Sequence, residues 1–266
     1  MRILSPSEIQ DSAIEAGSRK AALTRSSNAR LVVSAILAGC YIAFGGIFSV
    51  IMGQGFPGAA EQFPALPRLM SGLAFPIGLT LVVVLGAELF TGNNALLASS
   101  YLAKRHSAMD VVRNWTIVYF GNLVGAVAFA YLMVVACGLT AVEPYHSGLI
   151  KMATAKVSMP WITVFLKGIG ANWCVCLAVW LALSGKTLVE KALGCWIPVA
   201  LFVALGYEHC IANMFFIPCA MMEGADISVG TFVWNNLIPA TIGNIVGGAL
   251  LVGCVYGWMH RKKANQ

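Results

Sequence analysis

The chain has 266 residues, of which 59% are hydrophobic and only 11% are charged, and its mean hydropathy is +0.79. Soluble domains carry about 25% charged residues, so this composition excludes an ordinary soluble protein and predicts one that crosses a membrane several times. The formal net charge of +6 therefore requires an explanation by position along the chain rather than by nucleic-acid binding.

The eight cysteines all fall in apolar stretches. Cys174 and Cys176 form a single C-x-C pair and lack the second pair of a structural zinc site. We therefore expect the cysteines to be small packing residues, with no disulfide framework, metal site or cofactor. They are Cys40, Cys137, Cys174, Cys176, Cys195, Cys210, Cys219 and Cys254.

Residues 1–28 are polar and predict a cytoplasmic amphipathic helix that lies on the membrane surface. Ser5, Pro6 and Glu8 match a helix start, with a capping serine, a proline at the first position and an acid that closes a capping box. The short apolar stripe that follows consists of Ile9, Ala13 and Ala16. Gly17 is a weak point at which this helix can end. The stretch contains acids and no apolar core, so it is not a signal peptide.

Residues 29–260 contain six apolar segments of membrane length and are predicted to form one transmembrane domain. A short cytoplasmic tail, 261–266, follows. A simple span needs about 20 residues. The second and fifth segments are longer and contain polar residues near their middle, which predicts broken helices. The segments run from Leu31 to Met52, Leu69 to Ala103, Trp115 to Leu139, Trp161 to Leu183, Leu193 to Met222 and Phe232 to Met259.

The distribution of Lys and Arg predicts that both termini are cytoplasmic. With six spans, 13 of the 17 basic residues fall on the side of the termini, three (Arg68, Lys151 and Lys156) fall on the other side, and Lys167 lies within the fourth segment. Short cytoplasmic loops carry such an excess of basic residues. The net positive charge is therefore mostly a consequence of topology.

Two pairs of matching motifs predict an internal repeat. "GAELFTGN" at 86–93 and "GYEHCIAN" at 206–213 both fit G-x-E-x-x-x-x-N and lie 120 residues apart. "GNLVG" at 121–125 matches "GNIVG" at 243–247 at an offset of 122. We therefore expect two halves of three spans each, at 29–140 and 155–260. Because each half has an odd number of spans, the halves are inverted relative to each other, which places a substrate path at the bilayer midplane.

The predicted breaks favour an anion. Irregular backbone at membrane depth is tolerated only where protein or a water-filled cavity covers it. Helix N-termini that point inward carry free N–H groups and partial positive charge. The glycines expected to allow the breaks are Gly78, Gly86, Gly92 and Gly206.

His209 is the one histidine of the four that falls inside a predicted span, and an ionisable residue inside the membrane indicates a functional site. Imidazole titrates near physiological pH, so this side chain suits donation of a proton or a strong hydrogen bond. Its neighbour Glu208 points elsewhere, because successive helix positions differ by about 100°. A satisfied packing histidine is the structural alternative.

Four stretches, "GAELFTGN", "NWTIVYFGNLVGA", "ANWCVCLAVW" and "GYEHCIANMFFIP", closely resemble the formate/nitrite transporter family, and the resemblance extends over essentially the whole chain. It implies an all-α, aquaporin-like protomer with six spans and broken helices 2 and 5, assembled as a homopentamer in a bacterial-type cytoplasmic membrane. The implied function is passage of formate, nitrite or hydrosulfide, with protons and lipid as the other partners. An aquaporin N-P-A pair is absent from the sequence.

The resemblance assigns a role to several residues. It implies that His209 faces the pore and that Thr91 contacts it from the opposite break. Glu208 is expected behind the pore with Asn172 and Asn213 as companions, and Glu88 is expected to brace the other break. The two apolar constrictions implied by the family consist of Phe75, Leu79, Leu89, Phe90 and Phe202. Such constrictions reject bare ions by dewetting.

Two lysines are expected to attract anions to a vestibule. Lys156 is predicted in the loop before the fourth segment and matches a family lysine with that role, although an isolated loop lysine is usually a solvated charge. Lys167 lies about 9 Å into the fourth helix and can also extend toward the membrane surface. Lys167 favours the nitrite or hydrosulfide branches, whereas "MFFIP" and "YFGNLVGA" favour the formate branch, so the substrate stays open.

The resulting hypothesis is an anion channel or proton symporter. An anion that enters a low-dielectric constriction becomes easier to protonate, and His209 supplies the proton or stabilises the charge. The N-terminal helix is a candidate gate for the cytoplasmic mouth. An intramembrane enzyme is disfavoured because no nucleophile–base set or metal-ligand cluster accompanies Glu208 and His209. A channel for neutral solutes is disfavoured by Lys156, Lys167 and the inward helix N-termini.

Overall fold

The computed structural model describes residues 3–260, and every regular element in that range is helical. The predicted tail 261–266 and Arg2, which entered the charge count, lie outside the described residues. The first half contains α1 (Pro6–Ser26), α2 (Asn28–Gln54), α3 (Pro57–Gln62), α4 (Ala65–Ala74), α5 (Ile77–Leu85), α6 (Phe90–Leu102), α7 (Ala108–Phe129) and the π-helix η1 (Ala130–Val135). The second half contains α8 (Tyr145–Val157), α9 (Trp161–Ser184), α10 (Leu188–Ala204), α11 (Cys210–Met222), α12 (Val229–Thr231), η2 (Phe232–Leu237), α13 (Ile238–Ile245), η3 (Val246–Cys254) and α14 (Val255–Met259).

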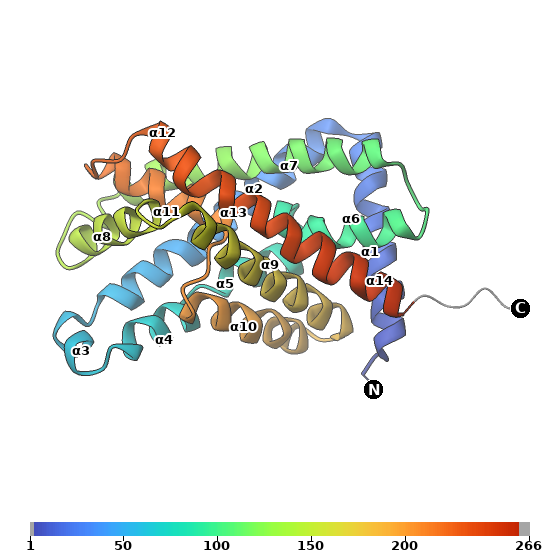
Figure 1. The fold of residues 1–266 in the computed structure, drawn as a ribbon, viewed down its shortest axis with the longest axis horizontal. Coiled ribbons are helices and arrows are strands. Elements are labelled where there is room, and N and C mark those ends of the chain that lie inside the picture. The colour runs from blue at the N-terminus through green and yellow to red at the C-terminus, as the bar shows by residue number, and fades with distance from the viewer. Residues whose placement is uncertain (1–2, 261–266) are drawn as a thin grey trace, which may run out of the picture.

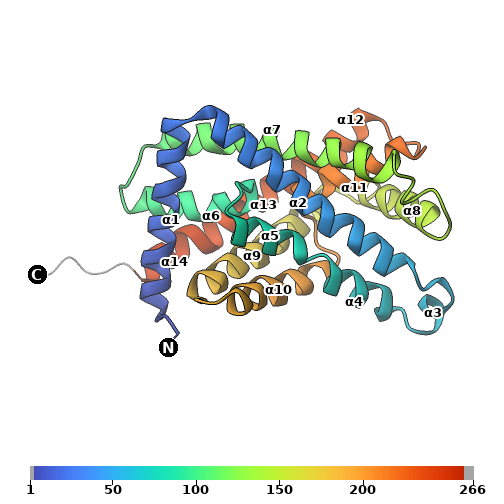
Figure 2. The same cartoon turned by 180° about the vertical axis from the view of Figure 1, so that it is seen from behind.

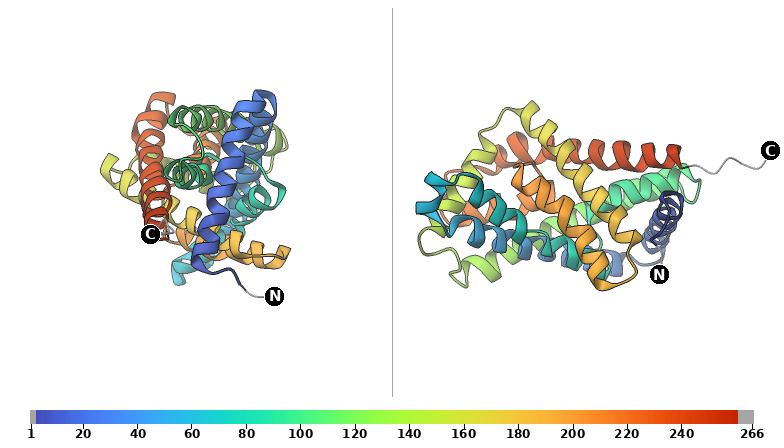
Figure 3. Two further views of the ribbon diagram at one scale, coloured as in Figure 1. Left: turned by 90° about the vertical axis from the view of Figure 1, so that its right-hand side faces the viewer. Right: turned by 90° about the horizontal axis from the view of Figure 1, so that it is seen from below.

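The long helices lie roughly along one direction, and α1 crosses them at one end (Figures 1 and 2). The connections that carry α3 and α12 lie at the opposite end, and α2 runs most of the way between the two ends (Figure 2). The views along and across the long axis show α1 laid across the helix ends rather than among the helices (Figure 3). That α1 lies on the cytoplasmic surface of the membrane stays a prediction.

The start of α1 was predicted correctly, and the helix does not end at Gly17, which was named as its weak point. Ser5 and Glu8 form the expected capping box, and the helix runs through Gly17 to Ser26. Gly17 does not end the helix because it serves for close packing: a Cβ atom there would lie 2.1 Å from the carbonyl oxygen of Leu96 in α6. The buried stripe of α1 consists of Gln10, Ala13, Gly17, Ala21 and Thr24.

Five stretches of helix in the described range are long and apolar enough to cross a membrane. They are Asn28–Gln54, Ala65–Leu85, Ala108–Val135, Trp161–Ser184 and Val229–Met259. The predicted fifth segment is present instead as two shorter helices, α10 and α11, of 17 and 13 residues. It misses the length of a single span because the chain leaves the helix between Ala204 and Cys210.

Both predicted helix breaks are present, and each begins at a glycine in a left-handed conformation. Gly86 caps α5 with φ 78°, and Gly206 follows α10 with φ 69°. Residues with a Cβ adopt this conformation only at a cost, so glycine suits both positions. Gly78 and Gly92, which were also expected to allow the breaks, are absent from the positive-φ glycines of the described range. Gly78 instead allows a close approach, because a Cβ there would lie 2.8 Å from the carbonyl oxygen of Tyr41 in α2.

Substituting Gly86 by Ala should lower the free energy of unfolding by about 1 kcal/mol, the cost of placing a Cβ in the left-handed region. Nothing lies within 4 Å of the added Cβ, so the conformational term is isolated from steric clash. Thermal unfolding of the purified protein in detergent measures the change. Gly58→Ala in α3 is the matched control, because its Cβ also meets nothing within 4 Å and its φ is not positive. Equal stability of the two variants would contradict this account.

The repeated G-x-x-x-G stretches pack two pairs of helices closely. In α7, a Cβ on Gly125 would lie 2.0 Å from the carbonyl oxygen of Ile36 in α2. In η3, a Cβ on Gly247 would lie 2.2 Å from the carbonyl oxygen of Ile169 in α9. Small residues at this spacing let membrane helices approach closely. The matching stretches therefore make matching contacts, α7 with α2 and α13–η3 with α9.

Candidate functional site

The two helix breaks bring His209 and Thr91 together near the middle of the protein. His209 is the N-cap residue of α11, and Thr91 lies in the first turn of α6. The Thr91 Oγ1 and His209 Nε2 atoms are 2.9 Å apart, although the residues are 118 positions apart in the chain. Both side chains are almost completely buried. The predicted contact between these two residues is therefore present.

The second ring nitrogen of His209 determines how this pair is protonated. His209 Nδ1 accepts a hydrogen bond from the backbone N–H of Ala212 at 3.1 Å. Since a backbone N–H can only donate, Nδ1 carries no proton, and in the neutral ring the proton is on Nε2. Nε2–H then donates to the Thr91 hydroxyl oxygen, which leaves the hydroxyl hydrogen free to donate. Protonating His209 fully would remove the helix cap, a cost of about 1 kcal/mol.

Thr91 is positioned by α9. Its carbonyl oxygen accepts from Asn172 Nδ2 at 3.2 Å and lies 3.4 Å from Cys176 Sγ. Asn172 also donates to Asn94 and to the carbonyl of Asn244. Asn172 was predicted as a companion of Glu208, but it makes no hydrogen bond to that carboxylate: its amide donates to Thr91 and Asn94 at the first break and to the backbone of Asn244 at the second.

Glu208 is a buried carboxylate with three donors. Lys156 Nζ donates to Oε1 at 2.8 Å, and the amides of Asn213 and Asn236 donate to Oε2 at 2.7 and 3.0 Å. Asn213 is thus the companion that was predicted, and Asn236 was missed. Lys156 lies in the last turn of α8 rather than in a loop, and its side chain is only 14% exposed. Its charge is therefore balanced by a neighbouring carboxylate.

The other break repeats this arrangement with different residues. Lys20 of α1 donates to Glu88 Oε1 at 2.9 Å, and Asn93 donates to Glu88 Oε2 at 2.7 Å. Asn93 also donates to Asn114, and in the second half Asn213 likewise donates to Asn236. Lys20 was missed as a site residue. The sequence carries no signal for it, because Lys20 and Lys156 are 136 residues apart and do not share the offset of the repeated motifs.

One further asparagine closes each break, and the two occupy matching positions in the two halves. Asn122 accepts from the backbone N–H of Phe90 and donates to the carbonyl of Glu88, both at 2.9 Å. Asn244 accepts from the N–H of Cys210 and donates to the carbonyl of Glu208, again both at 2.9 Å. These are the asparagines of "GNLVG" and "GNIVG". The repeated motifs therefore satisfy backbone groups that the breaks leave without helical partners.

A cavity lies on each side of the central pair. The α1-side cavity has a volume of about 380 Å³ and is lined by Lys20, Glu88, Leu79 and Leu89 among others. The α8-side cavity has a volume of about 240 Å³ and is lined by Lys156, Glu208, His209, Phe75 and Phe202 among others.

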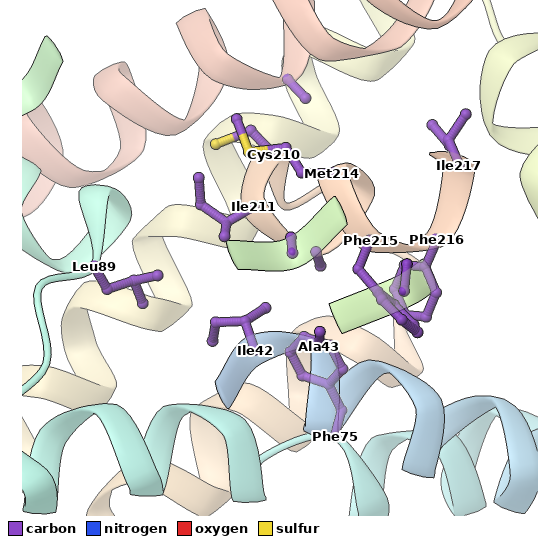
Figure 4. Close-up of a cluster of buried hydrophobic side chains, with 14 of the residues drawn as sticks. Ile42, Ala43, Phe75, Leu89, Cys210, Ile211, Met214, Phe215, Phe216 and Ile217 are labelled. Atoms are coloured by element: carbon purple, nitrogen blue, oxygen red, sulfur yellow. The ribbon is translucent and has the colours of Figure 1, made fainter. Parts of the chain in front are cut away.

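The five predicted constriction residues are all buried, but they lie in three places. Phe75 and Phe202 make an edge-on contact with ring centroids 5.8 Å apart beside His209, and Phe202 stacks on the imidazole at 5.8 Å. Leu89 is well separated from Phe75 and Phe216 (Figure 4), in agreement with its position on the other cavity. Phe90 packs instead against Trp115 and Tyr119 of α7 and lines a groove there.

Lys167 does not line the α8-side cavity. Its ammonium group lies 3.4 Å from Met159 Sδ, and its backbone carbonyl accepts from the N–H of Glu208 at 3.3 Å. The prediction that it attracts anions to this vestibule is therefore not supported by its position. Its side chain extends toward Met159, which precedes α9, while its backbone carbonyl bonds the N–H of Glu208 at the second break.

Comparison with known sequences finds one protein family over nearly the whole chain. Residues 7–258 match the family model described as "Formate/nitrite transporter". The chain is 41% identical to a probable formate transporter of Methanothermobacter thermautotrophicus, over 88% of this chain and 90% of the relative. It is 37% identical to the formate channel FocA of Escherichia coli K12, over 87% and 86% of the two chains.

Solved structures give the same result for the fold. A structure described as an FNT family ion channel superposes with a TM-score of 0.86 at 29% identity, covering 95% of this chain and 98% of the other. A pentameric formate channel with formate bound superposes with a TM-score of 0.76 at 35% identity, covering 88% and 98%.

The fold and the comparisons define a multi-pass helical membrane protein of the channel and transporter class. The chain belongs to the formate/nitrite transporter family.

Proposed function

We propose that the protein passes a small monovalent weak-acid anion across the cytoplasmic membrane and that formate is its substrate. The observation that carries the proposal is the buried contact between Thr91 and His209, with a cavity on each side of it. The names of the relatives favour formate: three of those compared are formate channels or transporters. Nitrite and hydrosulfide are the alternative substrates.

The proposed protomer has six spans in an aquaporin-like arrangement of two inverted halves, with both termini cytoplasmic, and assembles as a homopentamer. The duplicated glutamate, asparagine and lysine contacts at the two breaks support the inverted repeat. The pentameric formate channel that this chain resembles supports the assembly. The α1-side cavity is then the cytoplasmic vestibule, and the α8-side cavity is the outer one.

The proposed mechanism uses hydrogen bonding at the centre. An anion that enters either vestibule meets a lysine whose charge a glutamate balances, so the vestibule is polar without trapping the anion. At the centre, the Thr91 hydroxyl can donate to the anion because its oxygen already accepts from His209. The apolar side chains on either side, Leu89 and Phe75 among them, exclude bare hydrated ions. Proton transfer from His209 requires loss of the α11 cap and accompanies transport only if that bond breaks.

Uptake by proteoliposomes tests the proposal. Radiolabelled formate should enter faster than nitrite or hydrosulfide when the three are compared at equal concentration and pH. Osmotic swelling in glycerol serves as the control for a neutral-solute channel and should match that of protein-free vesicles. Faster uptake of nitrite or hydrosulfide would identify that anion as the substrate instead of formate. Swelling in glycerol without uptake of any anion would contradict the proposal.

A further inference from the structure

A groove on the lateral surface lies beside the first helix break. Its volume is about 380 Å³, and it is lined by Arg30, Val33, Leu37 and Tyr41 of α2 together with Leu85 and the residues that follow it. Apart from Arg30 at one end, most of these side chains are apolar. Gly86 and Ala87 line both this groove and the α1-side cavity, so the backbone of the break separates the two.

The second half of the protein shows how such a groove can be filled. The carbonyl of Ser34 accepts from the N–H of Glu88, and that of Lys167 accepts from the N–H of Glu208. When the two halves are aligned on these two hydrogen bonds, Gly170 of α9 corresponds to Leu37 of α2, and Tyr207 corresponds to Ala87. The ring of Tyr207 lies directly on Gly170, because a Cβ at Gly170 would be 2.4 Å from it.

The first half has no aromatic ring at the corresponding position. Ala87 has a methyl group where Tyr207 has a ring, and the neighbouring Leu85 and Leu37 remain 60% and 43% exposed. The groove is therefore a mostly apolar hollow that the side chains of residues 3–260 leave open. An occupant from outside the chain would cover the same position that Tyr207 covers in the second half.

The charge at the end of the groove indicates the chemistry of that occupant. Within residues 3–260, the guanidinium of Arg30 has no hydrogen-bond or ion-pair partner, and the residue is exposed. The two arginines nearby are engaged: Arg25 pairs with Asp110 at 3.0 Å, and Arg113 donates to Asn28 at 2.8 Å. A free guanidinium at the membrane surface suits a phosphate, which it binds through two parallel N–H groups.

The length of the groove matches one leaflet. Arg30 and Tyr41 are about 16 Å apart along α2 at about 1.5 Å per residue. Half of a hydrocarbon core of about 30 Å is about 15 Å. We propose that the groove binds one anionic phospholipid of the leaflet on the α1 side, with its phosphate on Arg30 and an acyl chain between α2 and the first break. The lipid takes the place of the missing aromatic ring and braces Gly86 and Ala87 from outside.

Native mass spectrometry of the full-length oligomer tests this binding. The protein is equilibrated with equal amounts of phosphatidylglycerol and phosphatidylcholine, and the retained lipids are counted. We expect preferential retention of phosphatidylglycerol, reduced about fivefold by Arg30→Gln, the effect of one arginine near an anionic headgroup. Arg105→Gln, an exposed arginine of the α6–α7 connection, should retain as much as the wild type. Equal retention by Arg30→Gln and the wild type would overturn the proposal.

A second variant copies the filled groove of the other half. Leu37→Gly combined with Ala87→Tyr should reduce retention of phosphatidylglycerol to the level of phosphatidylcholine while leaving the oligomer intact. Unchanged retention in this double variant would show that the lipid lies elsewhere. Loss of the oligomer in the same variant would identify a second copy of the chain as the occupant and would also overturn the lipid assignment. Because Arg30 is exposed, its variant remains informative even if the double variant does not fold.

Discussion

Replacing Lys156 by Met should lower the free energy of unfolding by about 3–5 kcal/mol, the effect of removing one partner from a buried ion pair. The Glu208 side chain is 3% exposed and that of Lys156 is 14% exposed, so loss of the ammonium group leaves a largely buried carboxylate without its counter-ion. Two asparagine amides remain on the carboxylate, but they do not neutralise it. Methionine keeps the length and apolar stem of lysine, so the loss is mainly one of charge.

The double variant Lys156→Met/Glu208→Gln separates charge from packing. Removing both charges should restore most of the lost stability, because a neutral amide at Glu208 needs no counter-ion. Thermal unfolding in detergent measures both variants, and Lys151→Met on the exposed face of the same helix is the control. If the double variant were no more stable than Lys156→Met, the ion pair would not be what Lys156 contributes.

Replacing Thr91 by Val should slow formate uptake at least about tenfold, because it removes a hydroxyl that donates to a charged substrate, an interaction of about 1.5–3 kcal/mol. Valine has nearly the same shape, so the passage itself is unchanged. His209 Nε2–H then loses its acceptor, while its Nδ1 still accepts from Ala212. The central hydrogen bond is lost without loss of the helix cap.

Proteoliposome uptake at matched protein density measures this effect. Thr80→Val is the matched control: Thr80 is also buried, but its hydroxyl donates to the carbonyl of Pro76 at 3.0 Å, within its own helical stretch, away from the central pair. It should transport formate at the wild-type rate. Wild-type uptake by Thr91→Val would show that the Thr91 hydroxyl is not used for the anion.

The sequence predicted the helix breaks, because two glutamate motifs at one offset can be recognised without a structure. The matching stretches that contain Asn122 and Asn244 supported the repeat, but the bonds of these asparagines to the backbone of the breaks were not predicted. The contact between Thr91 and His209 was implied by family resemblance, because a separation of 118 residues leaves no local signal.

Other features depend on helix rotation and depth, which composition does not determine. Lys167 and Phe90 are in apolar helices, and only the orientation of each helix shows that they point away from the cavities assigned to them. Lys20 lies on a surface helix that looked peripheral, and its contact with Glu88 appears only once α1 crosses the bundle end. The continuation of α1 past Gly17 likewise depends on its close approach to α6.

The role of His209 is tested by formate uptake into proteoliposomes that contain the His209→Ala variant, at a density and oligomeric state matched to the wild type. We expect formate uptake to fall at least about tenfold, because the hydrogen bond that orients the Thr91 hydroxyl toward the anion is lost. Formate uptake by His209→Ala at the wild-type rate would contradict it, and would mean that His209 serves only to cap α11 and fill the centre of the protein.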